Sequence, residues 1–314
     1  MKGMRFAAII VLIQMFTFSC RNEEKIASGE GFIDVNGGKI WYRVQGDGNS
    51  TPILMLHGGP GHPSHYLNPL AALGSQWPVI TFDQLGCGRS DRISDTSLMT
   101  VANYSSHINE LVNHLKLREF YLYGHSWGTM LGVDYYLKFG DKVKALILAS
   151  PCLDAQRWVK DAAVLISTLP DSVQRTLRTN MMGIQQDSLT LQAAVNMYLE
   201  NFYTRRQPIS ADLDSANLNM GYNVYQYMWG DFEFFASGTL KDYDRTGELS
   251  QIKVPTLYTV GEFDESQPAT VKYYQSVTPN SKLRLIPDAG HMTMHDNPDE
   301  NVKVISEFLN EIER

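Results

Sequence analysis

The sequence predicts an α/β fold, in which a mostly parallel sheet is flanked by helices. Short apolar runs of strand length alternate with helical patterns over most of the chain, which is typical of parallel strands joined by right-handed crossovers. Several runs, such as residues 52–56, are apolar throughout, as expected of strands buried on both faces. The alternation stops between residues 151 and 250, which indicates an inserted helical cap.

The bulk composition is that of a globular protein. The chain has 314 residues, of which 43% are apolar and 19% charged, so it is long enough for one large domain with an insertion. The formal net charge is −7 and no basic stripe is present, which argues against nucleic acid as a partner.

The N-terminus has the pattern of an export signal. Lys2 and Arg5 precede an apolar run over residues 6–18, which is too short to span a bilayer and suits a signal peptide. Ser19 and Cys20 follow this run, and polar residues come directly after Cys20. This arrangement resembles a bacterial lipoprotein signal. It predicts a signal peptide over residues 1–20, lipidation of Cys20, a polar tether over residues 21–29, and an exported protein attached to the membrane only through its lipid. The alternative is an ordinary signal peptide with an incidental cysteine.

Two cysteines remain if Cys20 carries lipid. Cys87 and Cys152 both lie near the ends of predicted strands. We expect two free, partly buried thiols, with a disulfide between them as the alternative.

The elements follow in a regular order. The first two strands form a hairpin about Asn36, Gly37 and Gly38, a good turn sequence. These elements put the α/β core at residues 30–150 and 251–314 and the helical cap at residues 151–250. The predicted strands are residues 31–35, 39–44, 52–56, 79–83, 120–123, 143–149, 255–260 and 282–286, and the predicted helices include residues 64–73, 100–117, 129–139, 188–202 and 299–312.

A nucleophile candidate stands between a strand and a helix. Residues 124–128 read G-x-S-x-G, after a predicted strand and before a predicted helix. Gly124 and Gly128 remove the side chains that would collide on a tight strand–turn–helix elbow, so Ser126 is exposed at its tip. A serine hydroxyl also needs a base to take its proton.

The base and its partner follow in chain order. Asp264 and His291 each come just after a predicted strand, so both fall at the same edge of the sheet as Ser126. His291 would accept the serine proton, and Asp264 would hold the imidazole in the required tautomer. A surface-loop role is the alternative for His291, and Glu262, Glu265 and Asp288 are alternative acids.

The oxyanion that forms during acyl transfer needs hydrogen-bond donors fixed in place. The backbone N–H of Trp127, directly after the nucleophile, is one candidate. Gly59 is the other, because residues 57–61 concentrate three glycines after a buried strand. The alternative for this loop is a simple tight turn.

Three motifs together resemble one family. Residues 57–61 (HGGPG), 83–90 (DQLGCGRS) and 124–128 (GHSWG) closely resemble the proline iminopeptidases, which are serine peptidases of the α/β-hydrolase fold. Residues 228–234 and 261–265 look like the tricorn-interacting aminopeptidase branch of that group. The resemblance runs from about residue 30 to the end of the chain and implies an α/β-hydrolase fold with an inserted helical cap.

The resemblance also implies an amine-binding pair. In that branch two glutamates bind the free α-amino group of the substrate, and the matching positions are Glu233 and Glu265. Poorly solvated carboxylates discriminate for a charged chain terminus, because an uncharged end leaves them unpaired. The alternative is that both glutamates are merely solvated. Nearby aromatic residues would line an apolar pocket for the first side chain: Tyr225, Tyr227, Trp229, Phe232, Phe234 and Phe235.

These observations predict a serine aminopeptidase that releases single N-terminal residues from short peptides with a free N-terminus. An esterase or amidase acting on small acyl substrates is the alternative, because the triad serves both. A catalytically idle binding lipoprotein disagrees with the intact Ser, His and Asp set. The sequence calls for no cofactor, and we see no set of residues with the spacing of metal ligands.

Overall fold

The computed structural model describes residues 26–185 and 187–314. The predicted signal peptide, Cys20 and the first part of the predicted tether lie outside these residues. Within the described ranges, no helix combines the length and apolar character needed to cross a membrane.

The described strands form one eight-stranded sheet in the order β1-β2-β4-β3-β5-β6-β7-β8. β1 and β2 form an antiparallel hairpin at one edge, and β2 also pairs with β4 in the antiparallel direction. All other neighbouring strands are parallel. Each predicted strand is present, with ends shifted by at most two residues. The strands are β1 (Gly29–Val35), β2 (Gly38–Gln45), β3 (Ile53–Leu56), β4 (Val79–Phe82), β5 (Phe120–His125), β6 (Val143–Ala149), β7 (Thr256–Gly261) and β8 (Ser281–Ile286).

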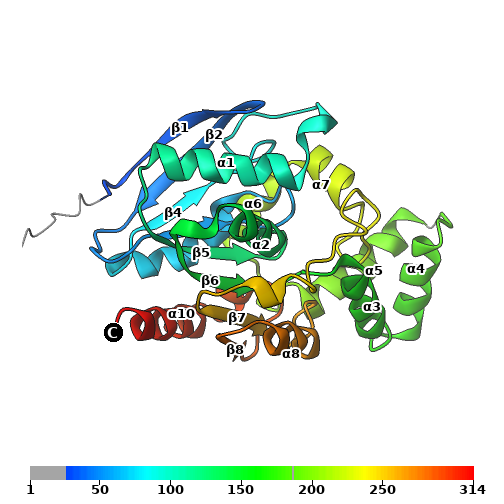
Figure 1. Cartoon of the computed structure of the whole chain (residues 1–314). Helices are drawn as coiled ribbons and strands as arrows, with labels where there is room; N and C mark the ends of the chain where they lie inside the picture. Colours follow the sequence, from blue (N-terminus) through cyan, green and yellow to red (C-terminus); the bar gives the residue numbers. More distant parts are fainter. Residues whose placement is uncertain (1–25, 186) are drawn as a thin grey trace, which may run out of the picture.

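Helices cover both faces of this sheet, as Figure 1 shows. Successive residues of a strand point to opposite faces. Leu54 and Leu56 therefore pack into one apolar cluster, whereas Ile53 and Met55 pack into another. The first cluster includes residues of α1 (Val101–His114), α2 (Trp127–Phe139) and α8 (Pro268–Val277), and the second includes residues of η1 (Ser64–Ser75), α6 (Ala211–Leu218), α9 (Thr293–Asp296) and α10 (Pro298–Ile312).

The predicted helix over residues 64–73 is a 3₁₀ helix, η1, rather than an α-helix. Pro69 lies inside it. A proline in a helix interior removes one backbone donor and clashes with the preceding turn, which disfavours regular α geometry.

Residues 151–250 divide into two groups of helices. α3 (Ala155–Ile166), α4 (Asp171–Met181) and α5 (Ser188–Phe202) share a separate apolar cluster with Phe234 and project away from the sheet (Figure 1). α6 and α7 (Tyr222–Met228) contribute instead to the two clusters that cover the sheet. The helices of this segment therefore reach from the main body outward over one edge of the sheet.

Candidate active site

Ser126 stands on the turn between β5 and α2, with φ 55° and ψ −124°. A Cβ at Gly124 would lie 2.3 Å from the carbonyl oxygen of Gly128, and a Cβ at Gly128 would lie 2.3 Å from that of Leu56. Both contacts are with backbone and cannot yield easily. The two glycines are therefore required by the close approach of the elbow to itself and to β3.

His291 and Asp264 form a buried pair. The imidazole Nδ1 lies 2.8 Å from Asp264 Oδ1, and the two side chains are 1% and 0% exposed. A carboxylate only accepts hydrogen bonds, so Nδ1 carries the proton and Nε2 is free to accept another. Asp264 is itself held by the backbone N–H groups of Ser266 and Gly261 at 2.8 and 3.1 Å. The alternative of a surface-loop histidine at 291 is wrong.

The other acids considered for this role lie differently. Glu262 and Asp288 are exposed. They contact each other, the backbone N–H of Asp288 donating to Glu262 Oε2 at 3.1 Å. Glu265 Oε1 is 3.9 Å from the other ring nitrogen of His291, Nε2. Asp264 is therefore the acid that orients the imidazole.

Ser126 and His291 line the same cavity, which has a volume of about 510 Å³. Among the described residues, no hydrogen bond reaches His291 Nε2, so Ser126 does not yet donate to it. Hydrogen bonds of this kind are commonly long without substrate and shorten in the substrate complex. The base and its nucleophile therefore share one cavity without a hydrogen bond between them.

Two backbone donors face the same place. Gly59 follows β3 with φ +106°, and its N–H donates no hydrogen bond to any described residue. Trp127 is the first residue of α2, where an N–H has no acceptor within the helix. Both residues line a second, narrower cavity next to Ser126. The two N–H groups are thus available to a developing oxyanion.

A buried chain of hydrogen bonds links the glycine loop to the histidine loop. The backbone N–H of Gly58 donates to the Tyr66 hydroxyl at 2.6 Å, and that hydroxyl lies 3.0 Å from His125 Nδ1. His125 Nε2 lies 3.0 Å from the backbone oxygen of His291. Burial lowers the pKa of His125 well below its ordinary value, so the ring is neutral. Nε2 must donate to the carbonyl, and Nδ1 accepts from Tyr66. Sequence patterns did not single out Tyr66.

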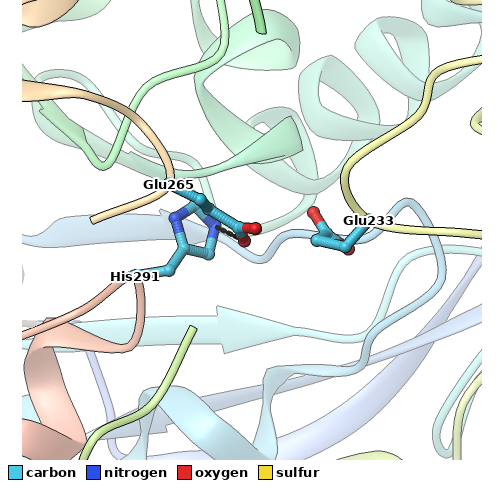
Figure 2. Close-up of side chains that lie close together, drawn as sticks. All are labelled: Glu233, Glu265 and His291. Atoms are coloured by element: carbon cyan, nitrogen blue, oxygen red, sulfur yellow. Dashed lines mark ion pairs between the residues drawn. The ribbon is translucent and has the colours of Figure 1, made fainter. Parts of the chain in front are cut away.

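Glu233 and Glu265 lie together beside His291, as Figure 2 shows. One ligand atom from each of the three residues lies within 4.8 Å of the other two. Glu265 is 0% exposed, so the alternative of a solvated side chain is wrong for it. Burial first, then the charges of Glu233 and Asp264, raise the pKa of Glu265 well above its ordinary value. Burial also raises the pKa of Glu233. Within the described ranges, the one ion pair of either carboxylate is that of Glu265 with His291 Nε2, at 3.9 Å.

Cap residues hold Glu233 in place. Its Oε2 accepts a hydrogen bond from the Tyr225 hydroxyl at 2.6 Å. Its backbone oxygen accepts from the indole N–H groups of Trp158 and Trp229, at 2.9 and 3.2 Å. Glu265 comes from the loop after β7, so the pair forms only where residues 229–235 fold over the edge of the sheet.

The two cavities differ in their walls. Of the aromatic residues predicted to line a pocket, Tyr225, Phe232 and Phe234 line the larger cavity and Trp229 lines the narrower one, whereas Tyr227 and Phe235 line neither. Exposed residues at the rim of the larger cavity, including Asn196, Glu200 and Gln207, connect it to solvent. The narrower cavity is lined by Gly59, Ser126, Trp127, Met130, Cys152, Trp158, Trp229 and Glu233.

Cys152 and Cys87 are both free and buried. The prediction that both thiols are free is confirmed, whereas the prediction that they are partly buried is wrong, since they are 0% and 3% exposed. Cys87 Sγ lies 3.7 Å from His57 Nε2, which also accepts from the backbone N–H of Gln84 at 2.8 Å. His57 is thus engaged in holding loops and lies outside the set of residues around Ser126.

Comparison with known proteins agrees with this geometry. Residues 51–298 match the family model described as the alpha/beta hydrolase fold. A proline iminopeptidase of Heyndrickxia coagulans is 39% identical over 286 residues, which cover 90% of this chain and 99% of that protein. One from Saccharolobus solfataricus is 33% identical over 291 residues, which cover 90% of this chain and 93% of that protein.

Solved structures share the fold of this chain. VinJ has a TM-score of 0.86 at 28% identity, over 91% of this chain and 99% of that chain. A proline iminopeptidase of Mycobacterium smegmatis has a TM-score of 0.85 at 24% identity, over 90% of this chain and 98% of that chain, and it shows the shared fold. From the sequence relatives and the family match, this chain belongs to the α/β-hydrolase fold family and, within it, to the proline iminopeptidase family.

Proposed function

We propose that this chain is a serine aminopeptidase that releases single N-terminal residues from short peptides through an acyl-enzyme. The observation that carries the proposal is the position of Glu233 and Glu265 beside His291, where Glu233 and His291 line the same cavity as Ser126. An esterase acting on uncharged substrates would leave these two carboxylates, one buried and one partly buried, without a cation. A protonated terminal amine would supply the cation that the pair lacks.

Each residue of the site has its own role in the proposed reaction. Ser126 Oγ attacks the carbonyl carbon of the first residue, and His291 Nε2 takes the serine proton and returns it to the leaving amine. Asp264 holds the imidazole and stabilises its cation. The N–H groups of Gly59 and Trp127 stabilise the oxyanion. A water molecule then attacks the carbonyl carbon of the acyl-enzyme while His291 Nε2 takes a proton from it. His291 returns this proton to Ser126 Oγ, and the first residue leaves.

The larger cavity suits the substrate peptide. It has a volume of about 510 Å³, it is lined by Ser126, Glu233 and His291, and it opens to solvent, so we assign the first residue and the rest of the peptide to it. The narrower cavity, of about 10 Å³, adjoins the proposed oxyanion donors and is too small for a side chain. The names of the curated relatives make proline the first residue to test.

The test is hydrolysis of a panel of aminoacyl-naphthylamides, proline included, each with a free and an acetylated amine. We expect turnover with free amines only, and none with Ser126→Ala, whose melting temperature should match that of the parent. Equal turnover of the acetylated compounds would refute the aminopeptidase reading and would make the chain an esterase or amidase.

We also propose export and attachment to a membrane through lipid on Cys20. The support is the pattern of residues 1–20 alone. Mass spectrometry of the mature N-terminus after expression in bacteria should find a diacylglyceryl cysteine at position 20, and Cys20→Ser should release the protein from the membrane fraction. An unmodified N-terminus at Met1 would refute the proposal.

A further inference from the structure

We propose that Glu233, Glu265 and His291 form a binding site for Zn²⁺, and that the bound metal competes with the substrate amine. The three residues offer two carboxylates and one imidazole, and their ligand atoms lie within 4.8 Å of one another. Three protein ligands with one open position is the arrangement found in zinc sites that exchange a fourth ligand. The affinity for zinc does not depend on the proposed function, although the competition does.

Two of the three groups have ligand atoms without a well-formed hydrogen bond. Among the described residues, no hydrogen bond of good geometry reaches Nε2 of His291 or either carboxylate oxygen of Glu265, although these side chains are 1% and 0% exposed. The Tyr198 hydroxyl is the neighbour that interacts with Glu265, and it too is buried without a hydrogen bond of good geometry. Buried polar atoms without partners are costly. They point toward Glu233 across a short gap, as Figure 2 shows. A cation placed there would satisfy all three side chains at once.

The surrounding hydrogen bonds already orient the ligands for a metal. His291 donates its Nδ1–H to Asp264 Oδ1 at 2.8 Å, which leaves the Nε2 lone pair free, with Glu265 Oε1 at 3.9 Å. A carboxylate behind a metal-bound histidine is the usual means of fixing the tautomer and raising the basicity of the ligand. Glu233 is held similarly by the Tyr225 hydroxyl at 2.6 Å.

The geometry requires a small closure. Zinc bonds of about 2.0–2.2 Å place tetrahedral ligand atoms roughly 3.3–3.6 Å apart. The Nε2 to Oε1 distance of 3.9 Å is close to this range. Glu233 is the one member of the three that is only partly buried, so rotation of its carboxylate can supply the remaining movement. Imidazole with carboxylate favours Zn²⁺ over Mg²⁺, which prefers six oxygen ligands.

The consequence is inhibition at two points. A zinc ion in this position would occupy the carboxylates proposed to bind the substrate amine, and it would hold the Nε2 atom proposed to take the Ser126 proton. Metal and substrate cannot be bound together. Zinc should therefore raise KM for a free-amine substrate and leave kcat unchanged.

The experiment is calorimetric titration of the purified full chain with ZnCl₂ in a buffer that does not chelate metal. We expect one site per chain, no heat from MgCl₂, and affinity reduced at least tenfold by either Glu265→Gln or Glu233→Gln. Glu262→Gln changes an exposed carboxylate three residues from Glu265 and should leave zinc affinity within twofold of the parent. Melting curves identify any variant that fails to fold, and Glu233, which is less buried, provides the second test.

Competition with prolinamide, an amine that resembles the substrate terminus, distinguishes a failure of the zinc site from a failure of the proposed function. Prolinamide at saturating concentration should weaken the apparent zinc affinity. Zinc binding that is unchanged in both glutamine variants overturns the zinc site, and so does zinc binding that persists alongside bound prolinamide. Zinc binding that both variants weaken, in a protein that prolinamide does not bind, supports the zinc site and refutes the proposed amine site.

Discussion

Asp264 shows how much of the chemistry depends on one side chain. Its carboxylate accepts from His291 Nδ1 and from two backbone N–H groups, so its position is fixed on three sides. Of the acids near the end of β7 and β8, it alone among the described residues contacts Nδ1. The tautomer of His291, and with it the ability of Nε2 to act as a base, follows from this contact.

We predict that Asp264→Asn lowers kcat by about 10⁴-fold, because an amide no longer selects the tautomer that leaves Nε2 free. KM should change little. Asp288→Asn is the matched control, since Asp288 is exposed and has φ 57°, which asparagine tolerates. Steady-state kinetics of both variants are the measurement. A loss of similar size in both would mean that Asp264 acts only through folding.

The glutamate pair makes a second prediction for single side chains. Glu265→Gln and Glu233→Gln should lower kcat/KM for free-amine substrates by at least about 10²-fold, because each removes a charge-assisted bond to the ammonium in a site shielded from water. Residual turnover of the acetylated substrates should not fall in parallel. Glu262→Gln should behave as the parent. Equal losses on free and acetylated substrates would show that the glutamates do not recognise the amine.

The parallel strands bring these side chains together at one edge of the sheet. β3, β5, β6, β7 and β8 run parallel, so their carboxyl ends share this edge. The loops that follow are nevertheless independent segments and need fixing relative to one another. The hydrogen bonds through Tyr66 and His125 do this, since they connect the loop after β3, the elbow after β5 and the loop after β8.

We predict that Tyr66→Phe lowers kcat about 10- to 100-fold with little change in KM, because small misplacement of reacting groups is costly. The substitution leaves the Gly58 N–H and His125 Nδ1 without partners. Tyr123→Phe is the matched control: Tyr123 is equally buried, and its hydroxyl has no hydrogen-bond partner among the described residues. If both variants lose activity to the same extent, the link between the loops has no special role.

The molecule as a whole buries several histidines in the neutral form. Burial lowers the pKa of His57 to about 4, of His62 to about 3 and of His107 to about 4. Their ordinary pKa in an unfolded chain is about 6.5. Between pH 6.5 and 4 the unfolded chain therefore binds protons that the folded chain does not, so the free energy of unfolding falls as the pH falls. The raised pKa of Glu265 acts in the opposite direction.

We predict that His107→Gln flattens this pH dependence by about one proton, or roughly 1.4 kcal/mol per pH unit between pH 6 and 4.5. Glutamine can retain a donor to the backbone oxygen of Asn36, which His107 Nε2 contacts at 2.9 Å. His114→Gln, on the exposed end of the same helix, should leave the slope unchanged. Denaturant unfolding at several pH values is the measurement, and an unchanged slope in His107→Gln would contradict it.

Local patterns predicted most of the fold. Continuous apolar runs marked the buried strands to within two residues, because a strand covered on both faces has no polar side. The helix predicted at residues 64–73 is present, and Pro69 within it accounts for its 3₁₀ geometry, which the sequence pattern did not specify. α8 was not singled out, and the packing of α6 and α7 against the sheet was missed. These features depend on contacts between segments that are distant in the sequence, and the periodicity of residues within one segment does not report such contacts.

The sequence by itself determined which side chains are candidates for the chemistry of this protein. The elbow glycines, Ser126, Asp264 and His291 were visible because each meets a local requirement: a backbone contact that excludes a side chain, or a place directly after a strand. Only the tertiary structure decided how remote segments meet. It placed Glu233 from the cap beside Glu265 from the sheet edge, and it joined Tyr66 to His125. Such contacts arise from packing across the sheet edge, and the spacing of residues along a chain carries no information about them.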